Sequence, residues 1–226
     1  MQTQNLLGAR LESAVRYVTR GGRVIDVGTD HAYLPIALVQ RGIAAQALAC
    51  DINRGPIESA RENIAAAGLE GQITTLLTDG LHGTEHFNPT DIIVFGMGGE
   101  LIVRILEEAP RIRRAGVGLI LQPMSRASVL RRYLAETGFA ITGESLTFED
   151  KYYQTIAARF TGERYELSPI EAWVGPVVLS ERPPLFEGFV RHEIGVFDAI
   201  IKGKSKSAFA DLSHEAEMKR MLEELL

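Results

Sequence analysis

The sequence has a single cysteine, Cys50, among 226 residues. One cysteine cannot form an intramolecular disulfide, and low cysteine usage is typical of proteins in a reducing compartment. No apolar run reaches the roughly 18 residues that a membrane-spanning helix needs. The N-terminal segment also lacks the basic start and apolar core of a signal peptide. The sequence therefore predicts a soluble, cytoplasmic protein with no membrane partner.

An excess of positive charge is also missing. Lys and Arg number 24 against 29 Asp and Glu, which gives a formal net charge of −5. This balance argues against a protein that coats nucleic acid non-specifically, although it allows local basic patches. With 46% hydrophobic residues, the chain can bury the core of one domain of about 150 residues and still carry an appendage.

Short β-branched runs alternate with helical patterns in the first part of the chain, after an opening helix over 6–20. Strands are predicted over 23–27, 45–51, 73–78, 92–95 and 119–121. Five strand–helix units predict a parallel, doubly wound α/β sheet. Pro35 favours the first position of the helix that follows the first strand. Asp30 then lies in the loop upstream and is not the helix N-cap.

The pattern changes after this alternation. Two β-rich runs, 139–148 and 152–160, have no helix between them and predict an antiparallel hairpin at one edge of the sheet. Apolar residues then recur at helical spacing in two stretches, 186–201 and 209–225, separated by a basic turn at 202–206. We therefore expect a mostly parallel seven-stranded sheet in a domain of residues 1–160. A small helical domain over 161–226 follows it.

Glycine or acidic residues end four of the predicted strands: Gly28 with Asp30, Asp51, Asp79 with Gly80, and 96–99. Because the carboxyl ends of parallel strands meet at one edge, we expect these tips to share one pocket. Gly28 lets a ligand approach the backbone closely. Asp51 is placed to accept hydrogen bonds from ribose hydroxyls, and Asp79 could accept a hydrogen bond from an adenine amino group. The alternative for both aspartates is a plain turn or cap.

A dinucleotide site is the competing interpretation of this edge. That fingerprint requires Gly-x-Gly-x-x-Gly after the first strand, whereas Gly28 stands alone and Asp30 follows it. After the fourth strand, Gly96 and Gly98 are present but Leu101 occupies the third position. A carboxylate beside a pyrophosphate would repel it and instead suits a cationic cofactor.

Five segments resemble the bacterial tRNA methyltransferases of the TrmK family: 26–35, 51–56, 79–81, 96–99 and 121–124. The resemblance runs from Leu11 to Ala158 and returns at 174–176. It implies a class I methyltransferase sheet with a C-terminal helical domain, which uses S-adenosylmethionine to methylate N1 of adenine 22 in tRNA. Met124 departs from the asparagine that is frequent in related sequences, so it receives no role. The hairpin turn at 149–151 lacks an expected glycine.

The resemblance also implies which residues bind the cofactor: Asp26, Gly28, Thr29, His31, Asp51, Ile52, Asn53, Asp79, Gly80, Gly96, Met97 and Gly98. The acceptor base would contact Gly99, Gln122 and Pro123. The glycines at 96–99 leave room beneath it. Many adenine-N methyltransferases carry Asn-Pro-Pro-Tyr at this place, and this sequence does not.

The chemistry expected of such a site needs little acid–base catalysis. Adenine N1 already has a lone pair, so holding nitrogen, methyl and sulfur in line supplies most of the acceleration. Asp30 is the candidate catalytic residue, because a carboxylate there would stabilise the cationic product base and could accept a hydrogen bond from the exocyclic amino group of the adenine. Binding the cofactor's ammonium and a structural role are its alternatives. Tyr33 is the second candidate and would stack on the extruded base, line the cofactor's amino-acid end or lie in the core.

Basic residues supply the predicted tRNA contacts, namely Arg10, Lys202, Lys204 and Lys206. His82, Glu85 and His86 match the H-x-x-E-H spelling of one zinc-protease class. Gly83 weakens the helix that such a site needs, so no metal is predicted. The competing functions are a methyltransferase with another RNA, protein or small-molecule acceptor, and a tRNA-binding protein without turnover. The sequence slightly favours a monomer.

Overall fold

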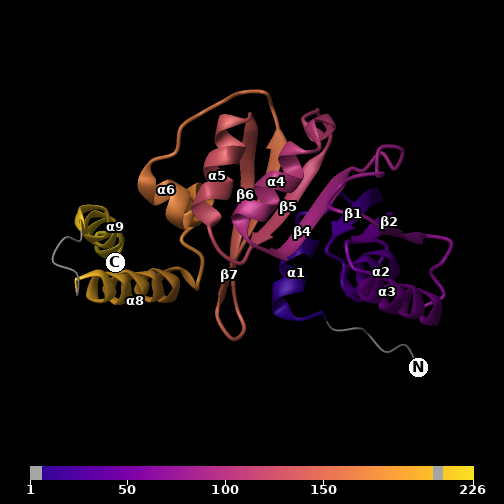
Figure 1. Ribbon diagram of the computed structural model, residues 1–226, viewed down its shortest axis with the longest axis horizontal. Helices are drawn as coiled ribbons and strands as arrows, with labels where there is room; N and C mark the ends of the chain where they lie inside the picture. Colours follow the sequence, from indigo (N-terminus) through magenta and orange to yellow (C-terminus); the bar gives the residue numbers. More distant parts are fainter. Residues whose placement is uncertain (1–6, 206–210) are drawn as a thin grey trace.

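A seven-stranded sheet forms the centre of the computed structural model, which describes residues 7–205 and 211–226 (Figure 1). Its strand order is β3-β2-β1-β4-β5-β7-β6. The strands are β1 (Gly22–Val27), β2 (Ala44–Asp51), β3 (Ile73–Leu77), β4 (Asp91–Met97), β5 (Gly118–Pro123), β6 (Phe139–Phe148) and β7 (Tyr152–Phe160). Pairing is parallel from β3 to β5, whereas β7 is antiparallel to both β5 and β6. The predicted sheet with its edge hairpin is confirmed.

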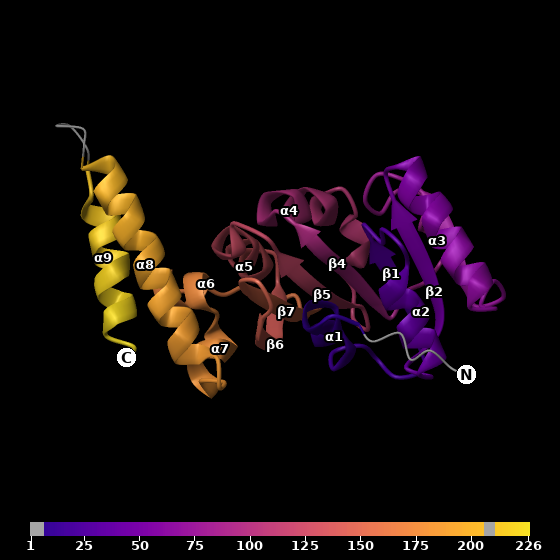
Figure 2. The ribbon, with the colours of Figure 1, turned by 90° about the horizontal axis from the view of Figure 1, so that it is seen from below.

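Helices cover both faces of the sheet because side chains alternate along its strands. In β1, Val24 packs in the core beneath α1, α2 and α3, whereas Ile25 and Val27 pack in the core beneath α4 and α5. Figure 2 shows α4 and α5 above the strands and α1 and α2 below them. These elements are α1 (Ala9–Val15), α2 (Tyr33–Gln40), α3 (Arg54–Ala66), α4 (Gly99–Glu107), the short 3-10 helix η1 (Pro110–Ile112) and α5 (Ala127–Glu136).

In the first part of the chain, the predicted end of the first helix and the predicted start of the second are wrong. The first helix ends at Val15 and not near residue 20, because the N–H groups of Tyr17 and Val18 bond to carbonyls three residues earlier and close a tighter turn. The second helix begins at Tyr33, two residues before Pro35, after Ala32 in a left-handed conformation. Asp30 nevertheless lies in the loop before this helix, as predicted.

Among the described residues, four helices follow the sheet: α6 (Pro169–Val174), α7 (Pro176–Glu181), α8 (Phe186–Lys204) and α9 (Ser213–Glu223). The last two form the predicted antiparallel pair, joined by a small core that includes Phe189, Phe197 and Leu222 (Figure 2). The predicted turn at 202–206 is wrong at its start, because α8 continues to Lys204. The helices α6 and α7 were not predicted. The domain boundary at residue 160 stays a prediction.

Candidate functional site

A pocket of about 240 Å³ opens at the carboxyl ends of β1 and β4. Its walls come from these two strand tips, from α1 and from the loop that leads into α2. The lining residues are Arg10, Leu11, Asp26, Gly28, Thr29, Asp30, His31, Tyr33, Leu34, Phe95 and Gly96. This is the sheet edge at which open α/β folds bind their ligands.

Asp26 supplies a buried carboxyl to the inner wall of this pocket. Thr29 Oγ1 donates to Asp26 Oδ2 at 2.7 Å, and both residues are buried. Burial raises the pKa of Asp26 to about 6, and the nearby Asp51 carboxylate acts in the same direction, whereas the Thr29 hydrogen bond opposes the rise. A cation in the pocket would therefore stabilise the ionised form of Asp26.

The loop after β1 has an unusual backbone. Gly28 has a φ of +76°, and a Cβ at this position would lie 2.5 Å from Met97 Cε, so both conformation and space favour glycine. Asp30 and Ala32 are also left-handed, with φ of 53° and 58°. Non-glycine residues rarely adopt this conformation, and such strain is frequent at functional sites.

This backbone presents three polar side chains at the mouth of the pocket. The Asp30 side chain is 71% exposed, and its Oδ1 lies 3.5 Å from His31 Nε2. The His31 ring stacks on the Tyr33 ring, with centroids 5.3 Å apart and planes 29° apart. Tyr33 is 44% exposed and is therefore not a core side chain.

The floor between β4 and β5 is organised by Gln122, which is fully buried. Its Oε1 accepts hydrogen bonds from Arg10 Nη1 at 3.1 Å and from Gly96 N at 3.3 Å. Its Nε2 donates to the Pro123 carbonyl at 3.1 Å. Gln122 therefore joins two predicted substrate-binding residues, Arg10 and Pro123, to the tip of β4.

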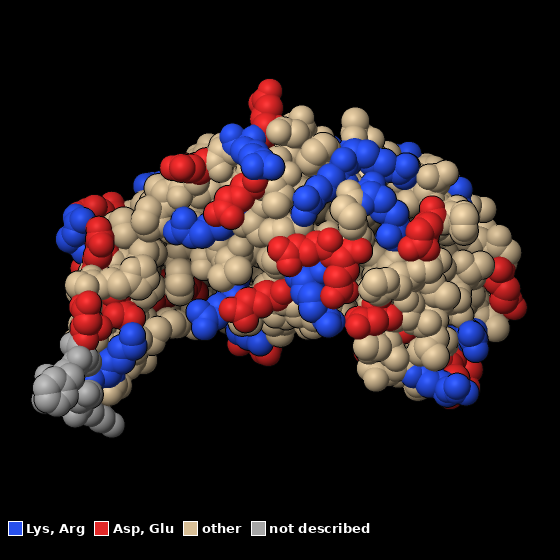
Figure 3. All heavy atoms as spheres, turned by 45° about the horizontal axis from the view of Figure 1, so that its top comes forward, with Lys and Arg blue, Asp and Glu red and all other residues tan. Residues whose placement is uncertain are grey.

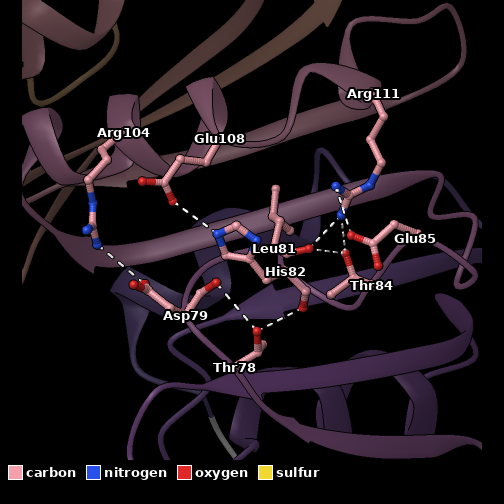
Figure 4. A network of polar contacts seen from close by, with 9 residues as sticks. All are labelled: Thr78, Asp79, Leu81, His82, Thr84, Glu85, Arg104, Glu108 and Arg111. Carbon is pink, nitrogen blue, oxygen red and sulfur yellow. Dashed lines mark hydrogen bonds and ion pairs between the residues drawn. The ribbon is translucent and has the colours of Figure 1, made fainter.

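The expectation that all four strand tips line one pocket is wrong in part, because Asp51 and Asp79 are absent from its walls. The Asp51 carboxylate turns back to accept a hydrogen bond from Asn53 N at 2.8 Å. Its carbonyl accepts from Thr78 N at 2.8 Å, which ties the tips of β2 and β3 together. Asp79 Oδ1 instead pairs with Arg104 Nη2 at 3.3 Å (Figure 4). Both carboxylates thus lie at the same sheet edge but outside the lining of this pocket.

The segment with the zinc-protease spelling forms part of the loop after β3 (Figure 4). His82 Nε2 lies 3.3 Å from Glu108 Oε2, and Glu85 pairs with Arg111 at 3.3 Å. Arg111 also donates to the Thr84 hydroxyl at 2.8 Å. His82 and Glu85 therefore have different partners. Within residues 7–205 and 211–226, no three His, Cys, Asp or Glu side chains are grouped to hold a metal ion.

Two of the predicted lysine contacts, Lys202 and Lys204, lie in the last turn of α8, away from the pocket (Figure 2). Lys204 Nζ pairs with Glu215 at 2.7 Å, and Lys206 lies outside the described residues. Surface charge is uneven: on the face in Figure 3, Lys and Arg form a strip at the upper right, whereas elsewhere they mix with acidic residues. None of the helices in the described ranges combines the length and apolarity needed to span a membrane.

Three apolar lining residues were not predicted: Leu11, Leu34 and Phe95. The first two lie on helices whose apolar positions are readable from sequence. Which of these positions reach the pocket depends on how α1 and α2 pack, and a single sequence does not contain that information. The positions of Ile52, Asn53, Gly80, Met97, Gly98 and Gly99 at or next to the strand tips agree with the predicted elements.

Comparison with known proteins identifies the class. A family model described as a methyltransferase domain matches residues 7–156. Together with the doubly wound sheet, this match defines a class I methyltransferase. The chain is 33% identical to the tRNA (adenine(22)-N(1))-methyltransferase of Bacillus subtilis, over 80% of this chain and 78% of that protein. The chain therefore belongs to the tRNA (adenine(22)-N(1))-methyltransferase family.

Solved structures support the same assignment. The crystal structure of the Bacillus subtilis tRNA methyltransferase TrmK has a TM-score of 0.85 and 29% identity, covering 97% of this chain and 98% of that one. Streptococcus pneumoniae Sp1610 in complex with S-adenosyl-L-methionine has a TM-score of 0.85 and 34% identity, covering 96% and 99%. Both likenesses include the C-terminal helices.

Proposed function

We propose that this protein transfers the methyl group of S-adenosylmethionine to N1 of adenine 22 in tRNA. Family membership over nearly the whole chain carries this conclusion. The pocket agrees with it, because two carboxylates and a close backbone approach at Gly28 suit a cationic nucleoside. S-adenosylmethionine, when bound, supplies an electrophilic methyl group on a positively charged sulfur.

The residues around the pocket have separable binding roles. Asp26 in the inner wall supplies negative charge for the cofactor's cationic end, with Thr29 fixing the direction of its carboxylate. Asp51 and Asp79, which lie at or just beyond the ends of neighbouring strands at the same sheet edge, are proposed to accept hydrogen bonds from the ribose hydroxyls and the adenine amino group. Asp79 can do so through Oδ2, because its ion pair with Arg104 uses Oδ1. Ile52 is 59% exposed beside Asp51 and offers an apolar surface to the nucleobase.

Asp30 is the proposed catalytic residue. Its exposed carboxylate at the pocket mouth can accept from the exocyclic amino group of the target adenine and stabilise the positive charge that develops on the base. Binding the cofactor's ammonium is the alternative role. The stacked rings of His31 and Tyr33 offer an aromatic surface to the extruded base.

The test is methyl transfer from labelled S-adenosylmethionine to unmodified tRNA, followed by mass spectrometry to locate the modified nucleoside. We expect 1-methyladenosine at position 22. A matched tRNA with guanine at this position is the control and should remain unlabelled. Label at another nucleotide, or in a protein or small molecule, would indicate a different acceptor. Cofactor binding without any transfer would indicate a tRNA-binding protein without turnover.

A further inference from the structure

Arg10 brings a positive charge into a pocket that is otherwise acidic. Its side chain lines the same walls as Asp26 and Asp30. Arg10 Nη1 donates to Gln122 Oε1 at 3.1 Å, and its Cζ lies 5.8 Å from the centre of the Tyr153 ring. Both of these partners are uncharged, so the two contacts orient the guanidinium without neutralising it.

The backbone around Arg10 is fixed by the β6–β7 hairpin. Glu149 Oε1, at the hairpin turn, accepts a hydrogen bond from Arg10 N at 2.9 Å. One turn further along α1, the Ser13 hydroxyl lies 2.6 Å from the Thr155 hydroxyl of β7. The guanidinium also reaches the tip of β4, because a Cβ at Gly96 would lie 3.7 Å from Arg10 Nη1. The side chain is therefore held in position before any ligand arrives.

This arrangement matches a zwitterion. The amino-acid end of S-adenosylmethionine carries an ammonium and a carboxylate next to its sulfonium. Asp26 and Asp30 suit the cationic groups but would repel the carboxylate. A guanidinium binds carboxylates through two parallel hydrogen bonds, and Arg10 is the only arginine among the lining residues of the described chain.

We propose that Arg10 binds the α-carboxylate of the methyl donor and selects donors that carry this group. The proposal rests on the proposed function, since it deepens the donor side of the same site. It replaces the tRNA contact that the sequence predicted for Arg10.

Calorimetry with two ligands tests this assignment. S-adenosylhomocysteine carries the carboxylate, and S-(5′-adenosyl)-3-thiopropylamine has the same skeleton and amino group without it. Arg10→Leu should weaken S-adenosylhomocysteine binding about 10- to 100-fold, the range for a hydrogen bond between charged groups. Binding of the decarboxylated analogue should change by less than about 3-fold. Arg10→Lys should retain part of the preference, because lysine keeps the charge but loses the paired geometry.

Arg16→Leu is the matched control, since Arg16 lies just beyond the same helix and contacts the Tyr17 ring instead of the pocket. An equal loss of both ligands in Arg10→Leu would overturn the proposal, because it would indicate general damage to the pocket. Unchanged S-adenosylhomocysteine affinity with a raised KM for tRNA would also overturn it and restore the phosphate contact. Failure of the unaltered protein to bind S-adenosylhomocysteine would instead refute the proposed function.

Discussion

Arg131 of α5 and Glu144 of β6 form an ion pair in which neither side chain is exposed, with Nε and Oε1 2.7 Å apart. The remaining guanidinium hydrogens bond to Gln154 and to carbonyls at the end of α6, and Glu144 Oε2 accepts from two N–H groups at the start of α7. One buried pair thus satisfies the ends of two short helices and attaches them to the sheet.

Removing one partner of this pair should be costly. Arg131→Met leaves Glu144 buried without its counter-ion, and we expect the free energy of unfolding to fall by about 3–5 kcal/mol. The double variant Arg131→Met, Glu144→Gln should lose less than the single variant, because no charge stays buried. Urea unfolding measures both. A loss below about 1 kcal/mol in Arg131→Met would mean that the pair has little effect on stability.

The buried carboxyl of Asp26 predicts a pH effect on stability. Its pKa of about 6 lies above the ordinary 3.8, so the folded protein binds the proton more tightly than the unfolded chain. Below pH 4 the Asp26 carboxyl is protonated in both the folded and the unfolded protein, and its burial does not lower the free energy of unfolding through ionisation. As the pH rises, ionisation of this buried carboxyl lowers the free energy of unfolding, and the loss is complete above pH 6. A rise of this size corresponds to about 3 kcal/mol.

Asp26→Asn should therefore be more stable than the unaltered protein at pH 8, with a gap that shrinks as the pH falls through 6 toward 4. Urea unfolding at several pH values measures this gap. Glu163→Gln, which changes an exposed residue, serves as the control. A constant gap between pH 5 and pH 8 would contradict the raised pKa.

Asp30→Asn separates catalysis from binding. Asparagine tolerates the left-handed backbone at this position, where φ is 53°, so the loop should keep its shape. We expect turnover to fall about 100-fold, since the carboxylate acts on charge that develops in the transition state. Affinity for S-adenosylmethionine should stay within a few-fold. Near-normal turnover at saturating cofactor, together with a large loss of affinity, would assign Asp30 to the cofactor's ammonium.

The lysines at the end of α8 can be tested through salt dependence. Lys202→Gln, Lys204→Gln should weaken tRNA binding and reduce the slope of log K against log salt by about 0.7–0.9 for each phosphate that the protein no longer neutralises. Lys219→Gln on α9, which removes the pairs with Asp198 and Glu223, is the control. An unchanged slope in the double variant would exclude these lysines from the interface.

Local pattern predicted the framework of this fold. The two hairpin strands cover the same residues as the two predicted runs, Phe139–Phe148 and Tyr152–Phe160, because strand periodicity is visible within a few residues. The helices α6 and α7 were missed because six residues are too few to show helical periodicity. Ser168 and Glu171 nevertheless form a capping box around Pro169, and this signal was present in the sequence.

The site was predictable only as far as topology determines it. Parallel strands bring Gly28 and Gly96 to one edge, and that prediction is confirmed. The ion pair between Asp79 and Arg104 joins residues 25 positions apart on different elements, so nothing local indicates it. The approach of Arg10 to the pocket depends in the same way on the packing of α1 against a distant hairpin.

The contact between Glu149 and Arg10 spans 139 positions of sequence. During synthesis on a ribosome, the first helix emerges long before the hairpin that fixes it. An incomplete chain therefore lacks one finished wall of its ligand chamber, however well its early strands have paired. Only release of the last two strands completes this wall, so the chain must be made as far as β7 before the Arg10 side of the pocket is in place.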